Sequence, residues 1–411
     1  MLQIRPIDVE KVLKEKKRFS ASVEHTVSKI ISDVEKRGDS ALKYWTKKFD
    51  GVDIENFQIS PQEIESSVKK IPAIDRKLIK QAIKRITDYH KRQRINQFVI
   101  KEKEIKISFR IKPVVRAGLY IPGGTAPLVS TVLMTGLPAK IAGVKEIIAC
   151  SPPSYNGSIH PYIIASLHLI GIDKIFRVGG AQAIAAMASG TETIPKVDVV
   201  AGPGNIYVNA AKKTLAGIIG IDLLAGPSEL VVLIDSSANP DFIIADLKSQ
   251  EEHNQSMIFL VSEDSATARK ISNNVKSGYW IKIDTMDSAI DIINHIAPEH
   301  LQIVCKNANA IADKFIAGAI FIGNYTPCAI GDYIAGPSHT LPTGGSAIFD
   351  SGLNVFDFIR TYAIIEANSQ FFKKHGIIAE RLAEIENLPY HKISIEIRRR
   401  QMKDSTTESK K

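Results

Sequence analysis

The sequence predicts an α/β protein made of two doubly wound units. From residue 113 onward, short apolar runs rich in β-branched residues alternate with helical stretches rich in Ala and Gly. The runs are continuously hydrophobic, which is typical of parallel strands whose two faces are both covered by helices. Their number exceeds what one open sheet needs. We therefore expect two units, the first of which ends near Leu230.

The N-terminal part, up to about residue 110, is predicted to form long charged helices. Apolar residues recur there at the spacing of one helix face: Val23, Val27, Ile30, Ile31 and Val34. Ser20 or Ser22 is the expected N-cap, and Asp50-Gly51 should end the segment. A further helix should begin at Ser60, because this cap residue is followed by a proline and a glutamate.

Seven strands and five helices are expected after residue 113. The strands are expected at 114–122, 145–150, 174–179, 197–202, 230–235, 256–262 and 319–324. The helices are expected at 130–143, 160–171, 180–190, 206–217 and 240–250.

The composition is that of an ordinary globular enzyme, with 44% hydrophobic and 24% charged residues among 411. A formal charge of +9 leaves open a basic nucleic-acid-binding protein that uses the clusters at 12–19 and 397–411. Interspersed acidic residues favour a solvated surface instead. Three widely spaced cysteines indicate reduced thiols. The sequence shows no signal-peptide pattern and no apolar run of membrane length. We therefore expect a cytoplasmic protein without a membrane or nucleic-acid partner.

Glycine-rich turns follow three of the expected strands: PGG at 122–124, VGGAQA at 178–183 and AGPGN at 201–205. Backbone amides in such turns can approach phosphate groups, although a glycine after a strand is more often part of a plain tight turn. Three together at the carboxyl ends of strands indicate a nucleotide site. A fourth turn, AGPSEL at 225–230, presents a serine hydroxyl.

A metal site is indicated by SQEEHNQ at 249–255. Gln250 and His253 are three residues apart, so a helix would project both to one side, although a solvated helix end has the same pattern. Further oxygen and nitrogen donors lie in two later segments: Asp332, His339, Glu386 and His391. Donors of this kind without thiolate suit zinc with an open position for a substrate.

The segment IAPEHLQI at 296–303 puts Glu299 beside His300 among apolar neighbours. One interpretation is the start of a helix, with Pro298 at its first position. The other is a catalytic pair, because a histidine titrates near neutral pH and burial can tune a glutamate toward it.

Several of these motifs together resemble the histidinol dehydrogenase family. They are GLYIPGGTAPLVSTVLMTGLPAKIAGV, VGGAQAIAAMASGTETIPKVDVVAGPGNIYV, AGPSE, SQEEH, APEHL and GDYIAGPSHTLPTGG, and they follow the family's order from about residue 20 to about 395. The resemblance implies an NAD-dependent alcohol and aldehyde dehydrogenase. It would oxidise L-histidinol through the aldehyde to L-histidine, the last steps of histidine biosynthesis, with one zinc ion per subunit.

The resemblance also implies roles for individual residues. Zinc would be held by Gln250, His253, Asp332 and His391. NAD would contact Tyr120, Gln182 and Asn205. Substrate would meet Ser228, His339 and Glu386, together with His300 and the zinc ligands. His300 would accept the alcohol proton, and Glu299 would activate the water that hydrates the aldehyde.

The family's fold further implies a homodimer in which His391 completes the partner's zinc site. The motif ENLPYH departs from the family, which usually has glycine after the glutamate and an alanine-type residue before the histidine. A zinc hydrolase, with Glu299 activating a metal-bound water, is the alternative enzyme.

Two Rossmann-like units are expected on this basis, the second inserted in the first. The expected ranges are 1–14 for an N-terminal segment, 15–122 with 230–353 for the first unit, which carries zinc, 123–229 for the inserted unit on the NAD side, 354–400 for dimerisation segments and 401–411 for a disordered tail.

Overall fold

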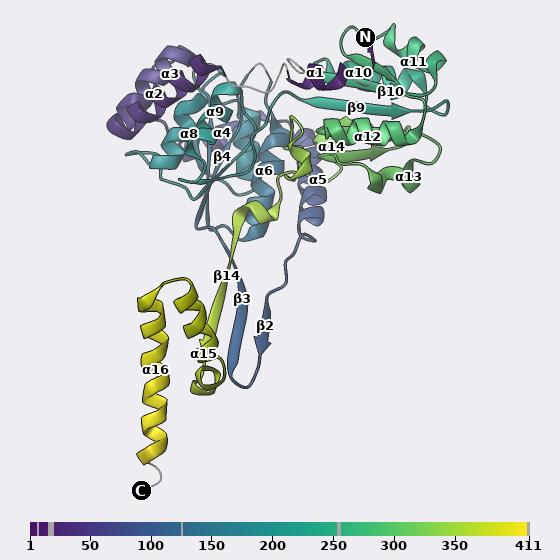
Figure 1. Cartoon of the computed structure of the whole chain (residues 1–411). Helices are drawn as coiled ribbons and strands as arrows, with labels where there is room; N and C mark the ends of the chain where they lie inside the picture. The colour runs from purple at the N-terminus through teal and green to yellow at the C-terminus, as the bar shows by residue number, and fades with distance from the viewer. Residues whose placement is uncertain (6–7, 15–19, 125, 253–255, 409–411) are drawn as a thin grey trace. The chain divides into compact units, whose positions relative to one another are not determined.

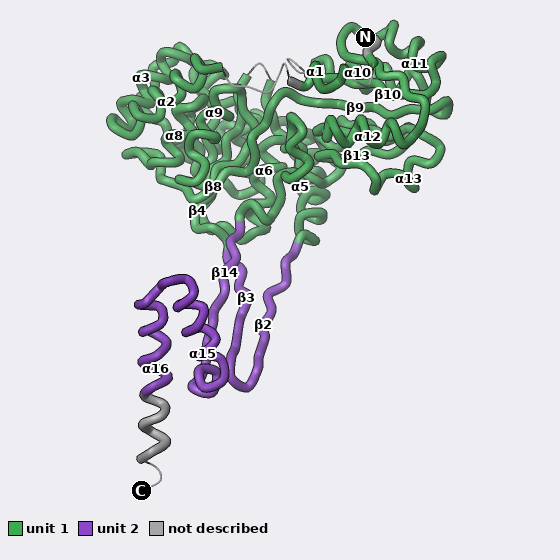
Figure 2. The backbone as a smooth tube through the Cα atoms, viewed as in Figure 1, with its two compact units in different colours: residues 1–93, 113–358 green, residues 94–112, 359–411 purple. Residues whose placement is uncertain are grey.

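A computed structural model of the chain describes residues 1–5, 8–14, 20–124, 126–252 and 256–408, without the side chains of 2–4, 14 and 401–408. The chain divides into two compact units (Figure 2). Unit 1 comprises residues 1–93 and 113–358, and unit 2 comprises residues 94–112 and 359–411.

Unit 1 contains a five-stranded parallel sheet in the order β6-β5-β4-β7-β8. Its central strand β4 is labelled in Figure 1. Numbered along the chain from β4, the strands have the order 3-2-1-4-5 of a doubly wound fold. Its strands are β4 (Arg116–Tyr120), β5 (Glu146–Ser151), β6 (Lys174–Arg177), β7 (Val199–Ala201) and β8 (Gly220–Ile221).

Helices cover both faces of this sheet, as the continuously apolar strands require. One face carries α2 (Ala21–Arg37), α3 (Asp39–Asp50), α8 (Gly180–Ser189) and α9 (Ile206–Leu215). The other carries α4 (Pro61–Lys70), α5 (Ala73–His90), α6 (Val129–Ala142), α7 (Pro161–Leu169) and η4 (Val355–Phe358).

A six-stranded parallel sheet repeats this order as β1-β11-β10-β9-β12-β13, with the N-terminal strand β1 added at one edge. Its strands are β1 (Leu2–Ile4), β9 (Glu229–Ile234), β10 (Met257–Ser262), β11 (Tyr279–Lys282), β12 (His300–Val304) and β13 (Ala319–Ile322). Successive residues of β9 pack on opposite faces: Val231 lies in one core cluster and Val232 in the other.

Helices again cover both faces. One face is packed by α1 (Val9–Lys14), α12 (Met286–Ile296) and α13 (Ala308–Ile311), followed by η2 (Ala312–Lys314). The other is packed by α10 (Pro240–Gln250), α11 (Ser265–Ser272) and α14 (Cys328–Tyr333). The short helix η3 (Ser346–Ile348) follows later in the chain.

Local signals fix where the N-terminal helices begin and end. The Ser20 hydroxyl accepts the N–H of Val23 at the start of α2, and Gly51 in the left-handed conformation ends α3. Ser60 and Glu63 form the expected capping box of α4.

Unit 2 consists of a three-stranded sheet in the order β14-β3-β2, whose β2–β3 pair is antiparallel, and two helices. Its elements are β2 (Phe98–Lys101), β3 (Ile105–Pro113), β14 (Ile359–Ala367), α15 (Ser369–Ile385) and α16 (Pro389–Glu408). A bidentate ion pair joins the helices, with Arg399 donating to both oxygens of Glu380 at 2.6 Å.

The predicted fold class is confirmed, because two parallel α/β sheets share the doubly wound order. The expected ranges match the elements less closely. Strand β4 precedes the expected boundary at 122/123, yet it pairs with β5 and β7. The helix α16 continues past residue 400, where a tail was expected, and residues 409–411 lie outside the described part.

The β2–β3 hairpin replaces part of the N-terminal segment for which only helices were predicted. Strand β3, with the sequence IKISFRIKP, alternates apolar and polar residues as a half-buried strand does, so this period of two was a usable signal that the helix prediction missed. No helix in the described residues is both long and apolar enough to cross a membrane.

Candidate active site

The three glycine-rich turns lie at the carboxyl edge of the five-stranded sheet, as predicted, because each directly follows β4, β6 or β7. Strands β4 and β7 are neighbours in the sheet although they are not consecutive in the chain. Their carboxyl ends therefore flank the point where the strand order reverses, at which doubly wound folds bind ligands. Tyr120 ends β4, and Asn205 follows β7.

Tyr120 is buried, and its hydroxyl accepts the backbone N–H of Gly180 at 3.1 Å. Burial raises the pKa of this phenol to about 12, so it stays protonated at neutral pH and keeps a donor. Tyr120 thus connects the end of β4 to the start of α8.

Gln182 and Asn205 both stand at helix N-termini, where backbone N–H groups favour anionic ligands. Gln182 is only 1% exposed, and its Oε1 has no hydrogen-bond partner among the described residues. Asn205 is exposed and caps α9, its Oδ1 accepting the N–H groups of Tyr207 and Val208 at 3.0 and 3.1 Å.

IAPEHLQI does not start a helix, so that interpretation is wrong. Helix α12 ends at Ile296, Ala297 takes a left-handed conformation with φ of 43°, and β12 begins at His300. The Glu299–His300 pair consequently lies at the amino end of its strand, not at the carboxyl end that is usual for sites in such folds.

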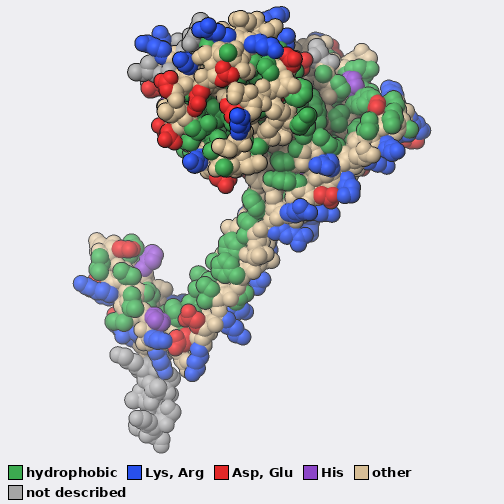
Figure 3. Space-filling model, turned by 90° about the vertical axis from the view of Figure 1, so that its right-hand side faces the viewer, with side chains coloured by type: hydrophobic (Ala, Val, Ile, Leu, Met, Phe, Trp, Pro, Cys, Tyr) green, Lys and Arg blue, Asp and Glu red, His purple; other side chains and the backbone are tan. Residues whose placement is uncertain are grey.

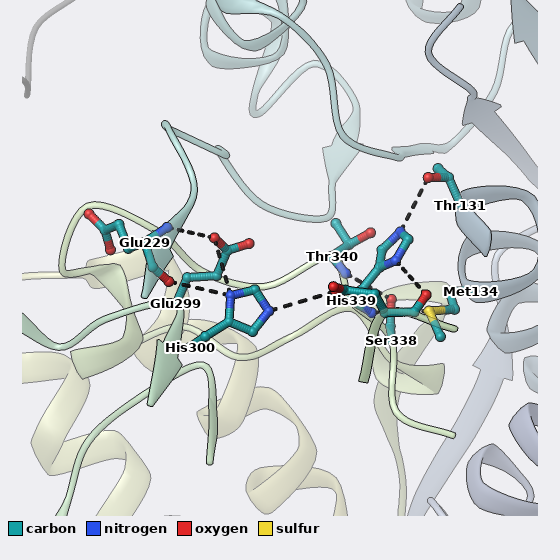
Figure 4. Close-up of polar contacts among 9 residues, drawn as sticks. Thr131, Met134, Glu229, Glu299, His300, Ser338, His339 and Thr340 are labelled. Carbon is teal, nitrogen blue, oxygen red and sulfur yellow. Dashed lines mark hydrogen bonds and ion pairs between the residues drawn. The ribbon is translucent and has the colours of Figure 1, made fainter. Parts of the chain in front are cut away.

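Both side chains of the pair are anchored on the backbone of Glu229, the first residue of the neighbouring strand β9 (Figure 4). The Glu229 N–H donates to Oε2 of Glu299 at 3.0 Å, and the Glu229 carbonyl lies 3.3 Å from Nδ1 of His300. Nδ1 is also 3.6 Å from Oε2 of Glu299. Glu299 and His300 are 7% and 5% exposed. One strand end therefore fixes the orientation of both groups.

This anchoring determines which nitrogen of His300 can act as a base. A carbonyl oxygen only accepts, so the contact with Glu229 requires the proton on Nδ1. In the neutral ring the lone pair is then on Nε2, which lies 3.9 Å from Oδ1 of Asp332.

Asp332 lies in α14, not in a loop as its motif indicated, and His339 lies in the loop that follows. The His339 ring is held from two sides: Nδ1 is 3.1 Å from the Asp332 carbonyl and Nε2 is 3.2 Å from the hydroxyl of Thr131 (Figure 4). Since Thr131 belongs to α6, His339 joins the two sheets of unit 1.

Of the four predicted zinc ligands, Gln250 and Asp332 lie in unit 1. Gln250 ends α10 and is 5% exposed, and its Nε2 has no hydrogen-bond partner among the described residues. His253 lies outside the described residues. His391, and with it the predicted substrate residue Glu386, is exposed on unit 2. No group of three His, Cys, Asp or Glu side chains suited to a metal occurs in the described part of the chain.

Ser228, the remaining predicted substrate contact, is partly exposed directly before β9. Sequence reasoning missed Glu229 and Thr131. Glu229 contributes backbone groups, which cannot be predicted from the residue type. Its position next to Ser228 in AGPSE was nevertheless a usable signal.

The cysteines agree with the expectation of reduced, mostly buried thiols. All three are free, and Cys150 and Cys328 are buried. Burial raises the pKa of Cys305 to about 12 and raises those of the other two, so none is a thiolate nucleophile at neutral pH.

Comparison with known proteins identifies the chain's relatives. The histidinol dehydrogenase family model matches residues 13–399. The chain belongs to the histidinol dehydrogenase family. A histidinol dehydrogenase of Oceanobacillus iheyensis is 41% identical over 398 residues, 92% of this chain and 93% of that protein. One from Geobacillus kaustophilus is 40% identical over 390 residues, 90% of this chain and 92% of that protein.

The crystal structure of histidinol dehydrogenase from Elizabethkingia anophelis has the same fold. It is 33% identical, with a TM-score of 0.92 over 98% of this chain and 99% of that one. Membership of the histidinol dehydrogenase family makes this chain an oxidoreductase of histidine biosynthesis, a dehydrogenase that uses a nucleotide cofactor.

Proposed function

We propose that this dehydrogenase oxidises L-histidinol to L-histidinal and then to L-histidine, with NAD and one zinc ion per subunit. The observation that carries the proposal is the buried pair Glu299 and His300, held side by side on the backbone of Glu229. Two oxidations separated by hydration of the aldehyde give each proton acceptor its own step.

When bound, NAD would accept hydride and zinc would hold the imidazole and amine of the substrate. His300 takes the hydroxyl proton of histidinol on Nε2, the nitrogen that its contact with Glu229 leaves unprotonated. The proton leaves the oxygen as hydride leaves the adjacent carbon, so the alcohol becomes the aldehyde.

Glu299 is assigned to the second step. The hydrogen on the aldehyde carbon cannot leave as hydride until water adds to that carbon, and the Glu299 carboxylate takes a proton from that water. One of its oxygens already accepts the Glu229 N–H, which holds the carboxylate in one orientation. Burial of the pair excludes bulk water and keeps a reactive aldehyde from side reactions.

The side chains assigned to zinc are Gln250, His253, Asp332 and His391. In Gln250 the carbonyl oxygen of the buried amide would be the zinc donor, since an amide nitrogen does not bind a cation, and Asp332 lies beside His300. Substrate contacts are assigned to Ser228, His339 and Glu386, and the NAD contacts to Tyr120, Gln182 and Asn205. The last group lies at the carboxyl edge of one sheet, where a dinucleotide would meet backbone amides.

We also propose a homodimer in which His391 enters the partner's site. Unit 2 exposes many apolar side chains (Figure 3), a feature that marks interaction surfaces. They include Ile365 on β14, Ile378 and Ile385 on α15, and Tyr390 on α16.

Shared sites can be tested by coexpressing His391→Ala subunits with Asp332→Asn subunits under two affinity tags. Each mixed dimer should contain one intact site, because each mutant supplies what the other lacks. Random pairing then restores about a quarter of the wild-type activity in the unselected mixture, and dimers that carry both tags should have about half. Mixed dimers as inactive as either parent would refute sharing.

The function itself is tested by incubating purified enzyme with histidinol and NAD. We expect about two NADH per histidine formed. Turnover of a substrate without NAD would instead identify a zinc hydrolase. Metal analysis of the same preparation tests for one zinc per subunit, and a cytoplasmic location stays a prediction.

A further inference from the structure

A fully buried ion pair lies beneath the nucleotide edge of the five-stranded sheet. Nζ of Lys212, in α9, is 2.5 Å from Oδ1 of Asp222, and the two side chains are 1% and 0% exposed. Buried ion pairs stabilise a fold little more than apolar residues of similar volume would. Stability alone therefore does not account for the pair.

The ion pair binds both backbone polar groups of one glycine. Lys212 donates to the Gly202 carbonyl at 2.6 Å, and Oδ2 of Asp222 accepts the Gly202 N–H at 2.7 Å. Gly202 has φ of 126°, and a Cβ there would lie 2.1 Å from the Tyr120 carbonyl. The first residue of the nucleotide loop 202–205 is thus clamped between the ion pair and the end of β4.

Asn209 holds the other end of the same loop and a second segment as well. It is 2% exposed, and its Nδ2 donates to the carbonyls of Gly204 and Asn205 at 2.7 and 3.1 Å. Its Oδ1 accepts the N–H of Ala225 at 3.1 Å. One side chain therefore links loop 202–205 to the segment 222–228.

The segment 222–228 runs from the end of β8 to the start of β9, and so from one sheet to the other. Asp222 stands at its beginning and Ser228 at its end. In between, the Gly226 N–H donates to the hydroxyl of Thr343.

We propose that Asn209, Lys212 and Asp222 are positioning residues that lock the nucleotide loop 202–205 to the substrate segment 222–228. The lock fixes the position of the substrate, which donates the hydride, relative to the nicotinamide, which accepts it. Asn209 and Lys212, three residues apart on α9, point to the same side and act as one unit. This inference rests on the proposed function.

Kinetics of Asn209→Ala test the lock. Misplacing two reacting groups slows their reaction while each still binds, so we expect kcat to fall ~10- to 100-fold, with KM for NAD and histidinol changed less. The matched control is Asn294→Ala. Asn294 likewise bridges two backbone groups, the Lys314 carbonyl and the Ile316 N–H, but on α12 away from both segments. Equal kcat in wild type and Asn209→Ala would overturn the proposal.

The ion pair needs a second design, because Lys212→Met alone leaves a buried carboxylate and should lower the melting temperature. The double variant Lys212→Met, Asp222→Leu should melt near wild type yet keep the low kcat. If the double variant regains both the wild-type melting temperature and the wild-type kcat, the ion pair has only a structural role. Lys140→Met is the control, since Lys140 also binds loop carbonyls, those of Ile170 and Gly171, at the opposite edge of the sheet.

Hydrogen exchange separates this proposal from the function it rests on. In Asn209→Ala, amides of 202–205 and of 222–228 should both exchange faster. Faster exchange in only one of the two segments would refute the lock. If wild-type enzyme forms no NADH from histidinol, the proposed function fails, while the exchange result still decides whether the segments are locked together.

Discussion

The two parallel sheets of unit 1 have the same strand order, yet they place their candidate residues at opposite edges. The five-stranded sheet uses its carboxyl edge, where glycine-rich turns follow β4, β6 and β7. The six-stranded sheet uses its amino edge, where Glu229, Glu299 and His300 begin β9 and β12. The segment 222–228 follows β8 and leads into β9. It therefore connects the carboxyl edge of the five-stranded sheet directly to the amino edge of the six-stranded sheet. The same strand order thus allows a site at either edge of a sheet, and the residues at each edge determine which one carries it.

The largest effect is expected at the amino edge, from His300→Asn. Loss of a positioned general base costs about 10²- to 10⁴-fold in rate. Oxidation of histidinol should fall by this factor while oxidation of added histidinal falls less. Stopped-flow measurement of NADH from each substrate distinguishes the steps, and an unchanged alcohol step would remove His300 from the mechanism.

A smaller effect is expected from Glu299→Gln, which keeps the oxygen that accepts the Glu229 N–H. The amide cannot take a proton from water, so aldehyde oxidation should slow ~10²-fold with the alcohol step nearly intact. Equal loss of both steps here and in His300→Asn would reject the division of labour between the two residues.

At the carboxyl edge, Gly202→Ala should raise KM for NAD about tenfold, because the added Cβ meets the Tyr120 carbonyl and displaces the loop. Gly217→Ala is the matched control: its φ of 91° carries the same backbone strain, but no atom lies within 4 Å of the added Cβ. Comparable KM values in both variants would indicate strain, not the loop, as the cause.

The smallest effect concerns Asp357 in η4, whose carboxyl feels the charges of Asp222 and Asp350. Burial raises the pKa of Asp357 from 3.8 to about 7. The folded state therefore holds a proton that the unfolded chain releases, and stability falls as pH rises between these two values. Asp357→Asn should abolish this fall and raise the melting temperature at pH 8 by ~2–4 °C. The exposed Asp291→Asn controls for the lost charge, and identical pH dependence in Asp357→Asn and wild type would contradict the assignment.

Sequence patterns predicted the features that depend on local chemistry. The cap at Ser60 and the turn at 178–183 follow from residue type and order alone. The anchoring of His300 by Glu229 depends on two strands far apart in the chain and on backbone atoms that every residue has. The contacts of Lys212 and Asp222 with Gly202 were not predicted for a related reason. A lysine in a helix is expected at the surface, and only the folded structure shows that Lys212 is buried beside Asp222.

The split of unit 2 between two distant parts of the chain governs when it can form during synthesis. The β2–β3 hairpin leaves the ribosome early, but its neighbour β14 is made only after all of residues 113–358. Until then the nascent hairpin presents the unpaired edge of β3, and Phe98, Val99 and Ile100 on β2 are exposed as well, as they are in the complete chain. Non-local pairing of this kind is slow and prone to aggregation, so we expect the emerging chain to depend on chaperones most during that interval.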